Sequence, residues 1–334
     1  IYNYFLKNYL KTKIKQNDNN YDNNQIQKDA IILSLYFCYY MKIPTKKLKD
    51  EYISQIKTVE NNLPFEEVSE RETNYIVDKI LKGRKGYAKN KGLKQNLFCE
   101  FVCLENKEPL IICGKPGSSK TLSIHLLLEV MKGENSSNEF FKQYKEVIPS
   151  FYQCILASKS EGIQEVFNRA RIKLKNSNYK NNCLVFIDVM GIADESKNNP
   201  LKVIHSELDQ NEELINIDEK ISFIGISNWS LDSSKMNRAI NIIVEDPDKD
   251  YIFNTGKEIA NSIRIINNST EKLIEAISET YLYYINEYQI NKGIEDFHGF
   301  RDFYYLIKYI FYNMGNIENE NEFKEYIHLT INES

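Results

Sequence analysis

The sequence has 334 residues, of which 42% are hydrophobic and 27% charged, and its formal net charge is −4. These values are typical of a globular protein long enough for two or three compact units. The acidic balance argues against a protein that binds nucleic acid through a strongly basic surface. For this reason, nucleic acid is not expected as a partner. No apolar run reaches the roughly 20 residues of a membrane span, so no membrane span is expected either.

Residues 1–70 are predicted to form an N-terminal helical segment and a linker from a preceding module. Helical spacing lies on both sides of the polar stretch 17–25. The run DAIILSLYFCYYMKI is apolar nearly all round, which favours burial against a neighbour. VENNLPFEEVSERE predicts a linker, because Pro64 would interrupt a helix. The first residue is not methionine, so we expect the chain to come from a longer protein.

Residues 75–248 alternate between helical spacing and short apolar runs, which predicts an α/β core with a parallel sheet and helices on both faces. The expected strands are 109–113, 147–156, 183–189, 222–228 and 240–246. After about residue 249 the strands stop, and the remaining periodicity is helical through NEFKEYIHLTIN. Residues 249–334 are therefore predicted to form an all-helical lid.

The six cysteines show no CxxC pair and no histidine at zinc-finger spacing. They lie mostly in apolar runs, where cysteine behaves as a small buried hydrophobic residue. Free thiols in a reducing compartment are the simplest interpretation, and a cytoplasmic location is expected.

A glycine-rich loop follows the first predicted strand and opens the next helix. It nearly satisfies G-x-x-x-x-G-K-[ST], the phosphate loop that cradles a nucleotide with backbone N–H groups. Its residues are Gly114, Lys115, Pro116, Gly117, Ser118, Ser119, Lys120 and Thr121. An ordinary Gly/Ser turn is the alternative, but the preceding strand and the following helix favour a site for ATP.

Two residues of this loop have specific expected roles. Lys120 would reach the β- and γ-phosphates, and the Thr121 hydroxyl would ligate Mg²⁺. Ser119 replaces the usual glycine, and the loop survives this change if the backbone there is near helical.

The strand CLVFIDV ends where P-loop ATPases hold their metal. Asp188 is the expected second Mg²⁺ ligand. The next residue is glutamate in most enzymes of this class that hydrolyse ATP, but here it is Val189, which cannot accept a proton. Asp194 and Glu195 lie several residues further on. We therefore expect nucleotide binding with weak or absent hydrolysis.

Three polar residues further along could complete the site. Asn228 ends the strand SFIGISN and could hold the γ-phosphate or its attacking water, although an Asn that starts a turn is the alternative. Arg238, near an expected short helix, could be an arginine finger for a neighbouring subunit's nucleotide. Arg301, at the start of a lid helix, could sense the γ-phosphate. Surface arginines are the alternative for both.

Six segments, taken in order, resemble an AAA+ module of the mysterin family, giant E3 ubiquitin ligases with tandem dynein-like AAA+ units. The resemblance covers about residues 75–312 and rests on GKPGSSKT, SFYQCILASKSEGI, LVFIDVMGIADES, PLKVIHSELD, FIGISNWSLDSSKMNRAI and GFRDFYYLIK. It implies ATP binding, the strand order 5-1-4-3-2 and a ring of neighbouring AAA+ modules. It supports Asn228 as first sensor, Arg238 as finger and Arg301 as lid sensor. Ubiquitin transfer is not carried over, because the family's catalytic parts lie outside this segment.

Three functions remain open at this point. The leading one is an ATP-binding module in which ATP acts as a conformational switch. The second is an active, mechanical ATPase with another carboxylate as the base. The third is an AAA+ protein directed to nucleic acid, which the acidic composition disfavours.

Overall fold

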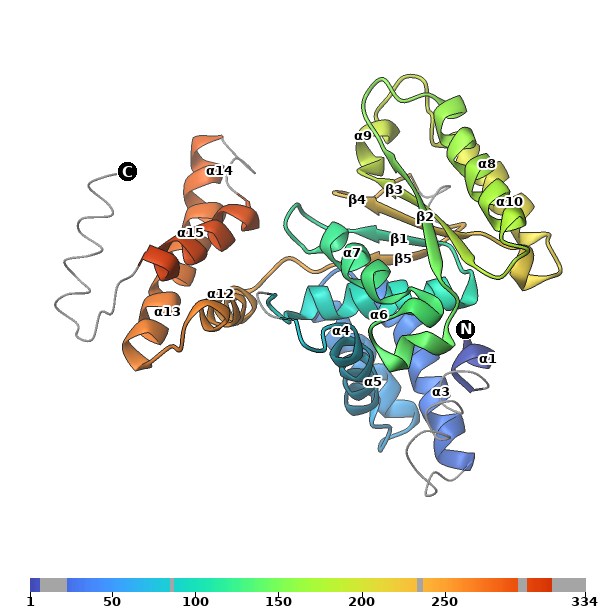
Figure 1. Ribbon diagram of the computed structural model, residues 1–334. Coiled ribbons are helices and arrows are strands. Elements are labelled where there is room, and N and C mark those ends of the chain that lie inside the picture. The colour runs from blue at the N-terminus through green and yellow to red at the C-terminus, as the bar shows by residue number, and fades with distance from the viewer. Residues whose placement is uncertain (7–22, 85–86, 233–236, 294–298, 314–334) are drawn as a thin grey trace. The chain divides into compact units, whose positions relative to one another are not determined.

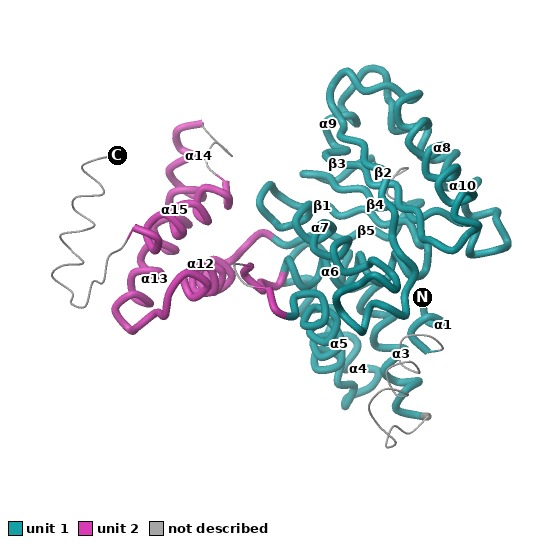
Figure 2. Tube along the Cα trace, in the orientation of Figure 1, with its two compact units in different colours: residues 1–82, 92–245 teal, residues 83–91, 246–334 magenta. Residues whose placement is uncertain are grey.

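The computed structural model describes residues 1–6, 23–84, 87–232, 237–293 and 299–313. The chain divides into two compact units (Figure 2). The first contains residues 1–82 and 92–245, and the second contains residues 83–91 and 246–334. Each unit is described by itself below.

A parallel five-stranded sheet forms the centre of the first unit (Figure 1). Its strands are β1 (Leu110–Cys113), β2 (Val147–Gln153), β3 (Asn182–Asp188), β4 (Ser222–Ser227) and β5 (Ile240–Ile243). Their order across the sheet is β2-β3-β4-β1-β5, which confirms the order 5-1-4-3-2 when read from the other edge. The first strand therefore lies inside the sheet, between β4 and β5.

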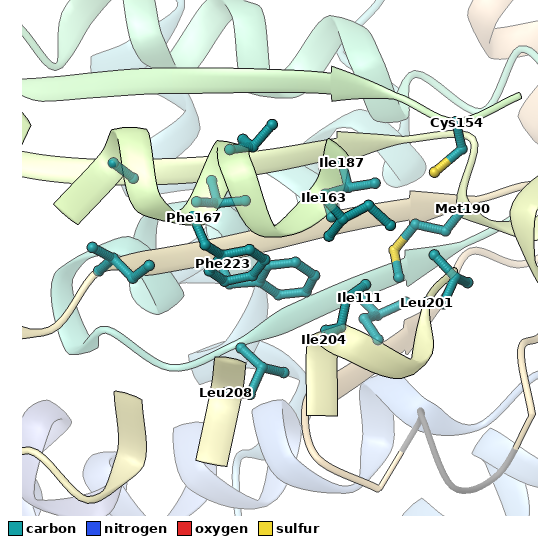
Figure 3. Packing of buried hydrophobic residues seen from close by; sticks show 14 of the residues in the cluster. Ile111, Cys154, Ile163, Phe167, Ile187, Met190, Leu201, Ile204, Leu208 and Phe223 are labelled. Atoms are coloured by element: carbon teal, nitrogen blue, oxygen red, sulfur yellow. The ribbon is translucent and has the colours of Figure 1, made fainter. Parts of the chain in front are cut away.

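One face of the sheet is covered by helices α8 (Ser160–Asn176) and α10 (Lys202–Glu212). Alternate residues of the strands point to this face, as the two-residue period of a strand requires. Phe167 of α8 stacks on Phe223 of β4 with ring centroids 5.9 Å apart (Figure 3). Ile111 and Ile187 belong to the same buried cluster. Apolar burial on this face holds β1, β3 and β4 together.

The other face carries helices α6 (Lys91–Asn106) and α7 (Lys120–Val130), the second of which follows the predicted phosphate loop (Figure 1). Phe186 of β3 contacts Phe151 of β2 edge to face, with centroids 5.5 Å apart. Phe151 in turn contacts His125 of α7 at 5.9 Å. The sheet is therefore covered on both faces, as the alternating pattern predicted.

The N-terminal segment of the first unit is helical over most of its described length. Its helices are α1 (Tyr2–Tyr4), α3 (Asn23–Cys38), α4 (Lys46–Val59) and α5 (Phe65–Ile80). The interpretation of residues 65–72 as a linker was wrong, because they form the first half of α5. Pro64 is the N-cap of this helix, where the N–H that proline lacks would have no helical partner. The buried side chains Val68, Ile76 and Ile80 then fix α5 in place.

The second unit contains only helices in its described part. They are α12 (Lys249–Ile263), α13 (Asn268–Tyr283), a π-helical turn (Tyr284–Tyr288), α14 (Gln289–Lys292) and α15 (Phe300–Asn313). Their buried faces meet around Ile274, Phe303 and Ile307. The expected helix NEFKEYIHLTIN lies outside the described residues. In the part that is described, no helix is long and apolar enough to cross a bilayer.

Candidate nucleotide-binding site

The loop 114–119 joins the carboxyl end of β1 to the first turn of α7. Its first residue continues the sheet, since Gly114 N–H donates to the Ser227 carbonyl of β4 at 3.1 Å. A Cβ at Gly114 would lie 2.9 Å from Cβ of Val244 and 3.0 Å from Oγ of Ser118, so only glycine fits there without a shift. The loop therefore leaves the middle of the sheet, at the edge where ligands bind in open α/β folds.

Ser119 adopts a left-handed backbone conformation, with φ +62° and ψ +15°. The condition stated for serine at this position, a near-helical backbone, is therefore not met. Ser119 is the N-cap of α7, and its side chain makes no capping hydrogen bond. A left-handed conformation costs a residue with a Cβ about 1–2 kcal/mol, which is the physical reason for glycine at this position.

The side chain of Lys120 is buried inside the loop. Its ammonium donates to the carbonyl of Gly114, to the carbonyl of Lys115 at 3.0 Å and to Oγ of Ser118 at 3.2 Å. Lys120 is only 6% exposed. A positive charge is thus held at the centre of a loop that opens onto a helix N-terminus, an arrangement suited to an anion.

Asp188 is the last residue of β3, and its backbone carbonyl accepts from the Cys154 N–H at 2.9 Å. Burial and the nearby Asp188 carboxylate raise the pKa of the Cys154 thiol to about 12. The strands are all parallel, so Asp188 and the loop after β1 lie at the same edge of the sheet. Thr121 is the second residue of α7 and is partly exposed.

Val189 has a backbone that its side chain disfavours, with φ +54° and ψ +44°. For a β-branched residue this left-handed conformation is an outlier, and such strain clusters at functional sites. Val189 is the N-cap of the short helix α9 (Met190–Asp194), which directs the chain away from β3. The side chain carries no group that could take a proton.

Asn228 follows β4, which lies between β1 and β3, and it is partly buried at the same carboxyl edge. The next residue, Trp229, contacts α9. A Cβ at Gly191 would lie 2.6 Å from Cε2 of the indole and 2.8 Å from Oγ of Ser227. Ser227 also donates to the Trp229 carbonyl at 2.6 Å. Sequence reasoning missed this close packing of Gly191 in α9 against Ser227 and Trp229 at the end of β4, although the glycine directly after Val189-Met190 was a signal for close approach.

The two acidic residues after Val189 lie at the far end of α9. Asp194 is the last residue of that helix, and its Oδ2 accepts from the Asp232 N–H at 3.4 Å. Glu195 caps the helix C-terminus. Both are separated from Asp188 by the length of the helix.

Arg238 lies just before β5, at the amino edge of the sheet and therefore opposite the loop 114–119. Its Nε donates to Oδ1 of Asp209 in α10 at 3.0 Å. Together with Lys107 and Lys220 it lines a cavity of about 420 Å³. Residues 233–236 of the expected short helix lie outside the described residues, and Asn237 and Arg238 form a turn.

Arg301 belongs to the second unit, where it is an exposed residue in the first turn of α15. The predicted site residues of the first unit thus fall into two sets. One set, from β1, β3 and β4, gathers at the carboxyl edge, and Arg238 lies at the amino edge.

The residues at the carboxyl edge fit ATP and Mg²⁺ chemically. The loop approaches closely at Gly114, and Lys120 already contacts three oxygen atoms, which phosphate oxygens could replace. Mg²⁺ in nucleotide sites uses one or two protein oxygens together with phosphates, which matches Thr121 and Asp188. The described residues contain no group of three or more His, Cys, Asp or Glu side chains that could hold a metal alone. All six cysteines are free thiols.

Comparison with known proteins gives consistent matches. The RNF213 AAA domain matches residues 86–251. The zebrafish (Danio rerio) E3 ubiquitin-protein ligase rnf213-beta is 32% identical over 315 residues, which is 91% of this chain and 6% of that protein. The human (Homo sapiens) and mouse (Mus musculus) E3 ubiquitin-protein ligases RNF213 are each 30% identical, over 86% and 84% of this chain.

The chain spans about 6% of the length of these relatives. The match covers the loop 114–121, the sheet and the segment that contains Asn228 and Arg238. The fold agrees with it, since the five parallel strands have the order of an AAA+ core. This chain therefore belongs to the RNF213 (mysterin) family and contains an AAA+ module of that family.

Proposed function

We propose that this chain binds Mg²⁺-ATP through the loop 114–121 and hydrolyses it slowly or not at all. The observation that carries the proposal is the buried ammonium of Lys120, which contacts Gly114, Lys115 and Ser118 in a loop at the helix N-terminus. The family supports it, since nucleotide binding is general for AAA domains.

Each residue at the carboxyl edge has a role in this proposal. The loop N–H groups and the N-terminus of α7 bind the phosphates, and Lys120 neutralises their charge. Thr121 and Asp188 hold Mg²⁺, which when bound neutralises charge between the β- and γ-phosphates. Asn228 hydrogen-bonds the γ-phosphate or a water beside it. Arg301, which belongs to the second unit, is the proposed lid sensor.

Hydrolysis needs a base within hydrogen-bond reach of the attacking water. Val189 stands at the position where a glutamate would supply it, and its side chain is a hydrocarbon. The alternative of an active ATPase would need Asp194 or Glu195, and both lie at the other end of α9. The position of these two carboxylates, at the end of α9 away from Asp188, favours ATP binding without efficient hydrolysis.

Bound ATP would then act as a conformational or structural switch. A ligand at 100 times its Kd stabilises the folded state by about 2.7 kcal/mol without any chemistry. Arg238, at the edge opposite the phosphate loop, would contact the nucleotide of a neighbouring AAA+ module in a ring. In the cytoplasm, such a module would serve a longer E3 ubiquitin ligase, as the names of the relatives suggest.

The test is binding of a fluorescent ATP analogue with Mg²⁺ to three proteins. The wild type is expected to bind, and Lys120→Ala to lose at least about tenfold in affinity, since one charge-assisted contact contributes about 1.5–3 kcal/mol. Lys132→Ala is the control and should bind as the wild type does, because it removes an exposed lysine just after α7 and outside the loop. Equal binding by Lys120→Ala and the wild type would refute the proposal, and so would no binding by the wild type.

A further inference from the structure

Two polar side chains of α6 are buried directly beneath the phosphate loop. Asn96 and Glu100 are both 0% exposed, in a helix most of whose residues are buried. They are four residues apart and so lie on the same face of α6. Buried polar groups of this kind are expensive unless they make specific contacts.

Both side chains contact the segment that forms the candidate site. Nδ2 of Asn96 donates to the backbone carbonyl of Ser118 in the loop, at 3.1 Å. Oε1 of Glu100 lies 2.7 Å from Oγ of Ser123, in the first turn of α7. The same Oγ lies 2.7 Å from the backbone carbonyl of Lys120. A chain of contacts therefore runs from Glu100 through Ser123 to Lys120.

The two contacts of the Ser123 hydroxyl bear on the protonation of Glu100. The Ser123 hydroxyl has one hydrogen to donate. Its oxygen lies between the Lys120 carbonyl and Oε1 of Glu100, and both of these only accept hydrogen bonds when the carboxyl is ionised. If Ser123 donates to the Lys120 carbonyl, Glu100 must bring a hydrogen of its own to Oγ. Among the described residues no cation pairs with Glu100, and its Oε2 has no hydrogen-bond partner.

The electrostatics of the position agree with a neutral acid. Burial raises the pKa of Glu100 well above its ordinary value, and the hydrogen bond with Ser123 offsets this only in part. The neighbouring thiols of Cys99 and Cys103, on the same helix, have pKa values that burial raises as well, so they stay neutral beside Glu100.

We propose that Glu100 is kept as a neutral carboxylic acid that donates a hydrogen bond to Ser123, and that Glu100 and Asn96 together position the phosphate loop for ATP. The inference rests on the proposed nucleotide site. Glu100 is a positioning residue, because it acts through Ser123 and Lys120 and contacts no phosphate itself. The neutral form also keeps a negative charge away from the place where the phosphates bind.

Two substitutions of the same size separate the roles of shape and hydrogen bond. Glu100→Gln keeps a neutral donor, and Glu100→Met keeps the length without any donor. With the fluorescent ATP analogue and Mg²⁺, Glu100→Gln is expected to bind within about twofold of the wild type. Glu100→Met is expected to bind the analogue about tenfold more weakly, because it loses the hydrogen bond between residue 100 and Ser123.

Ser123→Ala is the second route, in case Glu100→Met does not fold. It removes the hydroxyl that links Glu100 to Lys120, and alanine favours the helix. The same tenfold loss of affinity for the ATP analogue is expected. Thermal unfolding with and without the nucleotide shows that each variant is folded. If Glu100→Met and Ser123→Ala bind as tightly as the wild type, the positioning role is refuted.

The proton itself is tested by infrared difference spectroscopy between the wild type and Glu100→Gln at neutral pH. A neutral Glu100 gives the C=O stretch of a protonated carboxyl, which shifts in heavy water and is missing from the variant. A carboxylate band in its place would overturn the inference. This measurement needs no nucleotide, so the neutral acid can be established even if the wild type fails to bind ATP. That failure would refute the proposed function and the positioning role together.

Discussion

Lys49 of α4 forms an ion pair with Glu245, which follows β5 by two residues and is 196 positions away in the sequence. The Lys49 side chain is 2% exposed and that of Glu245 18%. Lys49 Nζ also lies 5.0 Å from the centre of the Tyr40 ring. Val244, beside Glu245, packs on Gly114, the first residue of the phosphate loop. The N-terminal helices are thus fastened to the strand end that supports the candidate site.

Replacing Lys49 with methionine should destabilise the first unit strongly. The substitution leaves the Glu245 carboxylate without this partner, and breaking a buried ion pair from one side costs about 3–5 kcal/mol. Urea unfolding measures the change. Lys47→Met, which alters an exposed residue of the same helix, should change the free energy of unfolding by no more than about 0.5 kcal/mol. Equal effects of the two variants would show that the pair contributes nothing.

A methyl group at Gly191 should disturb the close packing between α9 and the end of β4. Its carbon would lie 2.6 Å from the Trp229 indole, so the ring must move, and overpacking of this kind costs about 1–3 kcal/mol. The measurement is the free energy of unfolding of Gly191→Ala alone and in a Trp229→Ala background. The cost should fall in that background, where Oγ of Ser227, 2.8 Å from the new carbon, is the close contact that remains. If the cost stays the same there, the contact between Gly191 and Trp229 is not its cause.

Glycine at position 119 should stabilise the phosphate loop. Ser119 is in a left-handed conformation that glycine adopts freely, so Ser119→Gly should raise the free energy of unfolding by about 1 kcal/mol. Ser119→Val should lower it by at least as much. Ser206→Gly, in an exposed helix interior, is the control of opposite sign and should cost about 0.5–1 kcal/mol. A loss of stability in Ser119→Gly would contradict the backbone conformation described here.

The buried acid makes stability depend on pH. The folded-state pKa of Glu100 is raised above the ordinary value of 4.5, so the folded state retains a proton that the unfolded state has lost. The contribution of Glu100 to the free energy of unfolding is therefore fully present below about pH 4.5. It is lost as the pH rises toward the folded-state pKa, by about 1.4 kcal/mol per pH unit. Glu100→Gln lacks this loss, so its advantage over the wild type should grow with pH.

Chemical unfolding of both proteins at several pH values from 5 to 8 checks this slope. Glu129→Gln, which alters an exposed glutamate of α7, is the control and should follow the wild type throughout. Parallel curves for the wild type and Glu100→Gln would mean that Glu100 ionises as readily in the folded state as in the unfolded state.

The strands and the phosphate loop could be predicted because their signals are local. An apolar run followed at once by GKPGSSKT specifies both a strand and a loop, and all five expected strands are present. The linker prediction failed at Pro64 because the missing N–H of proline can interrupt a helix but is also tolerated where a helix begins. What decides between these is the buried face of α5, and that depends on distant residues.

The finer features of the site depend on the path of the chain in space. The left-handed conformations of Ser119 and Val189 follow from the turns that the neighbouring elements impose. Likewise, Glu100 looks like an ordinary polar residue of an amphipathic helix until α6 is seen to be buried on all sides. Its proximity to Ser123, 23 positions away, could not be read from spacing.

The central claim is that this module binds ATP but lacks the base for hydrolysis. The most direct measurement is steady-state ATP turnover by the wild type and by Val189→Glu, with nucleotide occupancy measured in both and Lys120→Ala as the inactive control. We expect bound ATP with little or no turnover in the wild type, and turnover gained in Val189→Glu. Turnover by the wild type that Lys120→Ala abolishes would contradict this claim, and would point to Asp194, Glu195 or a neighbouring module as the source of the base.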